Sequence, residues 1–299
     1  PAGTSSDTAS LVAASLPSSR SVQVGNTASA FATMINTSST AATDCSIAPQ
    51  TSVAADFSYQ TTDASNVPVG TPDTPVDIAA GESQSFIFAF QPSAPISPTE
   101  VLMTYDCTNS APAPVTVGVN TLLLSASATP VPDIVALVAT PSGDGIVDLP
   151  GTNGVNAFAV ATVNVGATGT ITASAVPSVT LPLVLSICET NPATGACLSD
   201  PAGSTTSSVS GGATPTYSIF VTGTGTVPFD PAANRIFVEF RDGGGLVLHG
   251  HELSRGHGRS WVEEFLQDAV VRKTSPDHVR AWCTAASYSD PLDRIPSKP

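Results

Sequence analysis

The chain has 299 residues, of which 41% are hydrophobic, 11% charged and 6% aromatic, and its formal net charge is -14. A chain of this length is expected to hold about two domains, each large enough to build its own core. The body, residues 1–247, has three basic side chains and no lysine. It therefore lacks the clustered positive charge that a nucleic-acid partner requires. No run of about 18 apolar residues occurs, so the sequence predicts no membrane span.

Short alternating segments in the first part of the body predict β-strands. Residues 31–36 and 101–105 are rich in apolar and β-branched side chains, and turn-forming residues separate such segments. Residues 85–90 alternate so that three phenylalanines share one face. Because a 3.6-residue period is absent, this part of the chain is predicted to be all-β.

A run of small residues and prolines, residues 125–132, predicts a short linker between two domains. Beyond it the strand pattern returns. Residues 158–164 echo residues 31–36, and further strands are predicted at 218–221 and 236–240. The two echoing segments begin 127 residues apart, which is close to the length of one β-sandwich. The body is therefore predicted to contain two related sandwiches.

Two segments of the first half resemble a known group of modules. Residues 31–38 (FATMINTS) and 78–92 (IAAGESQSFIFAFQP) are similar to the immunoglobulin-like modules of secreted bacterial proteins, in the ASPM-SPD-2-Hydin-like and CARDB-like groups. The resemblance covers about a third of the first domain and less of the second. It implies a spacer, surface-display or adhesion role, and it implies no shared catalytic residue.

The fold prediction is all-β. It comprises two tandem immunoglobulin-like β-sandwiches, residues 1–129 and 130–248, followed by a compositionally distinct tail, residues 249–299, that is short and helical or disordered.

Four of the five cysteines are placed to form two disulfides. Cys45 and Cys107 bracket strands of the first domain, a position compatible with a bridge across one sandwich. Cys188 and Cys197 flank a turn-rich segment. Separate buried thiols are the alternative. Two disulfides would imply an oxidising location, which is secreted, periplasmic or cell-surface. The chain begins at Pro1 without a leader, which predicts a processed product.

The histidines restrict the chemistry that the body can perform. All four lie in the tail, at positions 249, 251, 257 and 278, so the body alone contains no imidazole for a Ser-His-Asp or Cys-His site. Residues 252–256 lack the first glycine of a nucleophile elbow. A hydrolase would therefore need a tail histidine combined with a serine or carboxylate of the body.

Three short patterns are candidates for ligand or modification sites. His249, His251 and His257 have metal-ligating side chains at short spacing, and zinc is one interpretation, although exposed tail histidines are preferred. Residues 143–148 (GDGIVD) match half of a calcium loop, and the preferred interpretation is a turn entering a strand. No bound cofactor is predicted. The sequon at residues 36–38 indicates an exposed turn.

The tail differs in composition from the body, since both lysines and both tryptophans lie there. Two amphipathic helices are predicted, one from a capping box at residues 260–263 to Val270 and one over residues 275–286. Alternatively, residues 243–247 begin a final sandwich strand whose continuation a frameshift or sequence junction has replaced. The sequence favours neither interpretation.

The leading functional hypothesis is a non-enzymatic secreted or cell-surface structural or adhesion module. It would act through loops or strand edges on a protein or surface glycan partner. One alternative is the hydrolase with a tail histidine. A second alternative is a glycan-binding accessory module, which is disfavoured because the body lacks tryptophan platforms.

Overall fold

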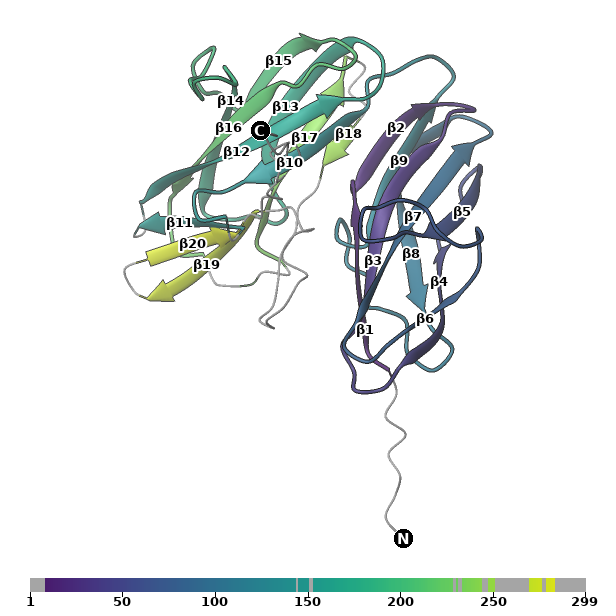
Figure 1. Cartoon of the computed structure of the whole chain (residues 1–299). Helices are drawn as coiled ribbons and strands as arrows, with labels where there is room; N and C mark the ends of the chain where they lie inside the picture. Colours follow the sequence, from purple (N-terminus) through teal and green to yellow (C-terminus); the bar gives the residue numbers. More distant parts are fainter. Residues whose placement is uncertain are drawn as a thin grey trace, which may run out of the picture.

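The computed structural model describes residues 9–143, 145–150, 153–227, 230, 233–243, 247–250, 269–275 and 278–282. These residues form strands and turns and no α-helix, which confirms the all-β prediction. Consequently, none of them lies in a helix long and apolar enough to cross a membrane. Figure 1 shows the strands gathered in two modules that lie side by side.

The first module consists of two sheets that share one core. The first sheet has the order β1 (Leu11–Leu16), β3 (Ala28–Asn36), β7 (Ser83–Pro92), β5 (Ala55–Thr61). The second has the order β2 (Ser19–Gln23), β9 (Thr121–Ser127), β8 (Ile96–Asp106), β4 (Ala42–Pro49), β6 (Val76–Ile78). Only β2 and β9 run parallel in this module. Because β1 belongs to the first sheet and β2 to the second, the chain crosses between the sheets after β1.

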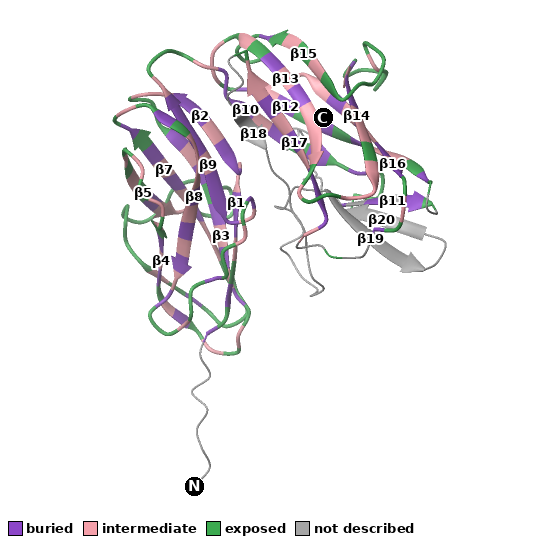
Figure 2. Ribbon diagram, turned by 180° about the vertical axis from the view of Figure 1, so that it is seen from behind, coloured by how far each residue is buried: buried purple, intermediate pink, exposed green. Residues whose placement is uncertain are grey.

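The core of the first module follows from the alternation of β7. Phe86, Phe88 and Phe90 are at most 1% exposed, which confirms that they share the inner face. Met103 and Tyr105 of β8 are fully buried against them from the facing sheet. Burial of each such side chain contributes about 1.5–3 kcal/mol. Figure 2 shows this alternation of buried and more exposed residues along the strands.

The second module again contains two sheets around its own core. The first has the order β10 (Ile134–Ala139), β12 (Val155–Asn164), β16 (Thr216–Gly223), β14 (Leu183–Thr190). The second has the order β11 (Ile146–Pro150), β20 (His278–Trp282), β19 (Ala269–Ser275), β17 (Arg235–Asp242), β13 (Gly169–Pro177), β15 (Ser204–Val209), and β18 (Val247–Gly250) also pairs with β17.

The two modules share one plan of strand pairing. Each pairing of the first module recurs in the second with strand numbers nine higher, apart from one. In the first module β2 pairs with β9 in parallel, whereas β11 pairs with β19 and β20. The β19–β20 hairpin therefore takes the place beside β11 that this plan would give to β18.

The prediction of a helix over residues 275–286 is wrong. Residues 278–282 form β20, which pairs with β11 and β19. The valines of this hairpin favour an extended backbone, and the edge of β11 supplies the partner groups. A short apolar run does not distinguish helix from strand by its period alone. Residues 260–268, the first part of the other predicted helix, lie outside the described residues, and the last two begin β19.

The structure also corrects how the two echoing segments align. Asn36 and Asn164 each end the second strand of their sheet and are each fully buried. Aligning these asparagines places Phe31 and Phe158 one position apart. A shift of one residue reverses the face of a strand. Phe31 accordingly points outward and is 36% exposed, whereas Phe158 is buried.

The first module is expected to fold without the tail. Its buried cluster contains only residues between Ala9 and Ala126. We therefore expect a chain that lacks residues 251–299 to retain a cooperative β-type unfolding transition by circular dichroism. Loss of cooperativity in the whole shortened chain would show that the tail belongs to the core of the first module.

Candidate functional site

Two of the four histidines lie in strands of the second module. His249 lies in β18 and His278 in β20, whereas His251 and His257 lie outside the described residues. In the part of the chain that the structure describes, no three His, Cys, Asp or Glu residues are grouped so as to hold a metal ion. The described residues thus add no support to the zinc interpretation.

The described residues of segment 143–148 agree with the preferred interpretation, a turn that leads into a strand. Gly143 and Gly145 have φ angles of 66° and 75°, a left-handed conformation that glycine adopts without strain. β11 begins at Ile146. Asp144 lies outside the described residues.

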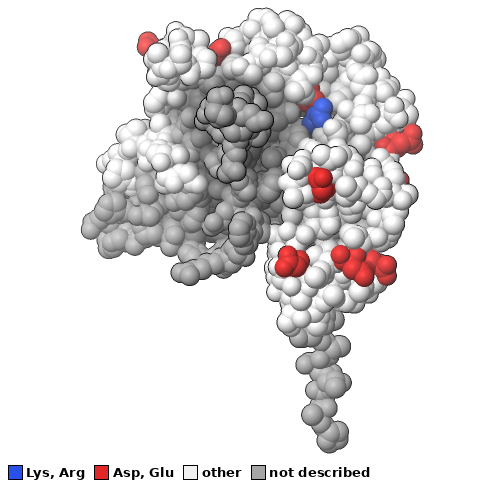
Figure 3. All heavy atoms as spheres, viewed as in Figure 1, with Lys and Arg blue, Asp and Glu red and all other residues white. Residues whose placement is uncertain are grey.

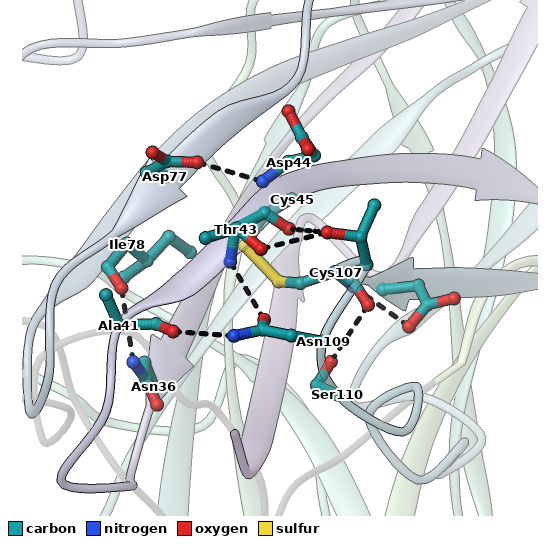
Figure 4. The surroundings of a disulfide bond; sticks show 12 residues. Asn36, Ala41, Thr43, Asp44, Cys45, Asp77, Ile78, Cys107, Asn109 and Ser110 are labelled. Carbon is teal, nitrogen blue, oxygen red and sulfur yellow. Dashed lines mark hydrogen bonds between the residues drawn. A yellow bond between two sulfur atoms is a disulfide. The ribbon is translucent and has the colours of Figure 1, made fainter. Parts of the chain in front are cut away.

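The disulfide between Cys45 and Cys107 joins neighbouring strands of one sheet. Its S–S distance is 2.05 Å and its Cα–Cα distance is 4.0 Å. Ser46 of β4 pairs with Asp106 of β8, so the two cysteines face each other one residue further along. The pairing is the one expected from the sequence. The expectation that it crosses the sandwich is wrong, because both strands belong to the same sheet (Figure 4).

The polar groups around this disulfide bond to one another. The Thr43 amide donates to Asn109 Oδ1 at 3.0 Å, and Asn109 Nδ2 donates to the Ala41 carbonyl at 2.8 Å. The Asp44 amide donates to Asp77 Oδ1 at 2.9 Å (Figure 4). These contacts fix the loops at this end of the module. They are structural contacts, and no nucleophile with an adjacent base is among them.

The second disulfide closes a short loop at the end of β14. Cys188 and Cys197 are joined with a Cα–Cα distance of 5.6 Å, as the turn-rich spacing predicts. Just before and after this loop, Ile187 and Ala202 exchange two backbone hydrogen bonds of 2.7 and 3.0 Å. Two disulfides in one chain indicate an oxidising, extracytoplasmic environment.

Asn36, the first residue of the sequon, is an internal anchor. Its Nδ2 donates to the carbonyls of Thr40, Ile78 and Ala79 at 2.6, 3.1 and 3.2 Å. Its Oδ1 accepts the Ser38 amide at 3.1 Å. Asn164 makes the equivalent contacts in the second module, donating to Ala167, Val209 and Ser210 and accepting from Gly166. The sequence pattern did not indicate this role, although both asparagines end echoing segments.

We expect Asn36 to carry no glycan in the folded protein, even from a host that glycosylates sequons. Nδ2 is the atom to which the glycan would be attached, and here it is buried and triply hydrogen-bonded. Mass spectrometry of the peptide would show the unmodified mass. Val155→Thr supplies a positive control, because it creates a sequon at the exposed Asn153. A glycan on Asn36 of the folded protein would contradict the buried position.

The two modules meet at a buried ion pair. Arg20 Nε of β2 donates to Asp133 Oδ2, just before β10, at 2.9 Å, and the two side chains are 14% and 3% exposed. The Ser21 amide donates to Asp133 Oδ1 at 2.9 Å, and Arg20 Nη1 donates to the Ser29 carbonyl at 2.5 Å. Burial raises the pKa of Asp133, and the charge of Arg20 and the Ser21 amide partly oppose this rise.

One further hydrogen bond joins the two modules. We define the inter-module junction as Arg20, Ser21 and Val117 of the first module with Asp133 and Arg235 of the second. Arg235 Nη1 donates to the Val117 carbonyl at 3.3 Å. The basic atoms visible in Figure 3 lie where the modules meet, whereas acidic atoms lie over both modules. Two of the three basic residues of the body thus serve the junction. Basic residues are rare in the body, so the sequence singles out Arg20 and Arg235. It does not show which residues they contact.

Comparison with known proteins does not identify a family. No family model and no curated protein matches the chain. Among solved structures, the chain has a weak similarity to the secreted serine protease VesC from Vibrio cholerae, with 11% sequence identity and a TM-score of 0.22. The match covers 75% of this chain and 49% of that chain, so it spans about half of the protease. Similarity at this level carries no argument about fold or activity.

Proposed function

We propose that the chain is a non-enzymatic secreted or cell-surface protein with a structural or adhesion role. Its two modules would form a stiff unit that presents loops and strand edges to a protein or surface glycan. The resemblance to immunoglobulin-like spacer and adhesion modules agrees with this proposal, as do the two disulfides.

The junction is the observation that carries the proposal. Its ion pair is shielded from water, and both of its side chains are hydrogen-bonded to backbone groups of the first module. We infer that this pair selects one arrangement of the two modules, because a buried ion pair by itself adds little net stability. A fixed angle between two sandwiches is useful to a protein that spaces or displays a surface, and it places no reactive groups together.

We expect the purified full chain to leave ester, peptide and glycoside substrates at background turnover. The hydroxyls of the body are poor nucleophiles without a positioned base. A reference hydrolase in the same assays serves as the positive control. Turnover that disappears on changing any of His249, His251, His257 or His278 to alanine would contradict the proposal and favour the hydrolase.

A further inference from the structure

β15 is a sheet edge that no described residue covers. The strand pairs with β13 on one side and ends the sheet on the other. It has six residues, Ser204–Val209, and none of them is charged or proline. Such an edge presents a row of backbone N–H and C=O groups to a further strand.

Three other sheet edges of this protein, those formed by β5, β14 and β6, are covered or short. Beyond β5 the chain folds back, so that Pro68 pairs with Thr62 and the Asp73 amide donates to the Tyr59 carbonyl at 2.8 Å. The residues after β14 cover its edge in the same way, through Ala202. β6, the counterpart of β15 in the first module, has only three residues and an irregular register. β15 lacks all of these protections.

The edge formed by β15 is at the opposite side of its sheet from β18, the strand that contacts β2 and β9 of the first module. It lies at the end of its sheet, beyond β17 and β13, on the side of the second module away from the first (Figures 1 and 2). A strand added there would extend the sheet without displacing the first module or the junction.

Charge indicates which partner this edge fits. Two copies of a chain with a net charge of -14 repel each other over most of their surfaces. β15 and β13 contain no charged residue, and in β17 Glu239 is paired with Arg241 at 2.5 Å. The hydroxyls of Thr172 and Thr206 already bond across β13 and β15 at 2.9 Å. A second strand of serines and threonines therefore suits this edge.

We propose that β15 pairs in antiparallel fashion with β15 of a second copy of this chain, forming a symmetric dimer with a continuous sheet. If the two-fold axis is perpendicular to the sheet, the solvent-exposed faces of both copies lie on the same side of the continuous sheet. This axis places Thr206 opposite Thr206 of the second copy, and Ser204 opposite Ser208. This inference rests on the proposed function, in which strand edges are the interacting surfaces. One pair of short strands makes a small interface, so the dimer is weak and concentration-dependent.

Sedimentation velocity of the full chain over a concentration series tests the pairing. The wild-type protein should dimerise progressively. Thr206→Lys and Thr206→Glu should each weaken dimerisation about tenfold or more, because like charges then meet at the axis. An equimolar mixture of the two variants should restore it to within about threefold of wild type, since opposite charges then meet. Ser58→Lys, a change on the covered strand β5, should dimerise like wild type.

Wild-type protein that stays monomeric at all concentrations would overturn the dimer. So would a lysine variant that dimerises normally, or a mixture that dimerises no better than its components. Circular dichroism checks that each variant is folded, and an unfolded variant would not restore association on mixing. Hydrolytic turnover would overturn the proposed function alone, whereas these sedimentation results bear on the dimer alone.

Discussion

Replacing Arg20 with methionine is expected to open the inter-module junction at neutral pH. Methionine keeps the length of the side chain but removes the counter-ion of Asp133, whose carboxylate is 3% exposed. Breaking a buried pair by removing one partner costs about 3–5 kcal/mol. Separation of the modules returns this carboxylate to water. Small-angle X-ray scattering should therefore show a more extended particle, and residues 128–132, between β9 and β10, should become sensitive to proteases.

The effect of Arg20→Met should depend on pH in a defined direction. Burial raises the pKa of Asp133 above its ordinary value of 3.8, and loss of Arg20 raises this pKa further. A carboxyl with a raised pKa in the folded protein contributes stability that is present below the unfolded value and is lost as pH rises through the folded value. The variant should thus be most compact at acidic pH, where Asp133 is protonated, and should open as the pH rises through the raised pKa of this carboxyl.

The matched control is the double variant Arg20→Met with Asp133→Asn. It removes both charges, and Oδ1 of the asparagine can still accept the hydrogen bond that the Ser21 amide donates. Its scattering profile should return towards that of wild type at pH 7. A single variant that keeps the wild-type profile and protease resistance at pH 7 would contradict the role assigned to this pair.

Changing Cys45 and Cys107 to alanine together is expected to destabilise the first module by about 4 kcal/mol, because the disulfide closes a loop of 62 residues in the unfolded chain. Its thermal midpoint should fall by more than about 10 °C. Calorimetry or thermal circular dichroism under non-reducing conditions measures this shift.

Alanines at Cys188 and Cys197 give the internal control. That disulfide spans only nine residues, so its loss should cost about 2.7 kcal/mol and should affect the second module. The transition of the first module should remain where it is. Equal effects of the two changes on the first module would contradict the assignment of the disulfides to separate modules.

Local sequence pattern encodes much of the fold of this protein. The alternation of Phe86, Phe88 and Phe90 is a property of adjacent residues, and it sufficed to place them on the inner face. The cysteine spacing likewise sufficed for both disulfide pairings. It did not show that Cys45 and Cys107 lie in one sheet, because sheet membership depends on how distant strands pair.

Only the tertiary structure decided the features that depend on non-local contacts. Residues 278–282 have an amphipathic pattern that fits a helix, yet the edge of β11 makes them a strand. The register that buries Phe158 and exposes Phe31 follows from the hydrogen bonds of Asn164 and Asn36. The sequence alone determined the all-β character of the body and the disulfide pairings, which periodicity and spacing encode. The junction joins positions 113 residues apart, and only the folded chain brings such positions into contact.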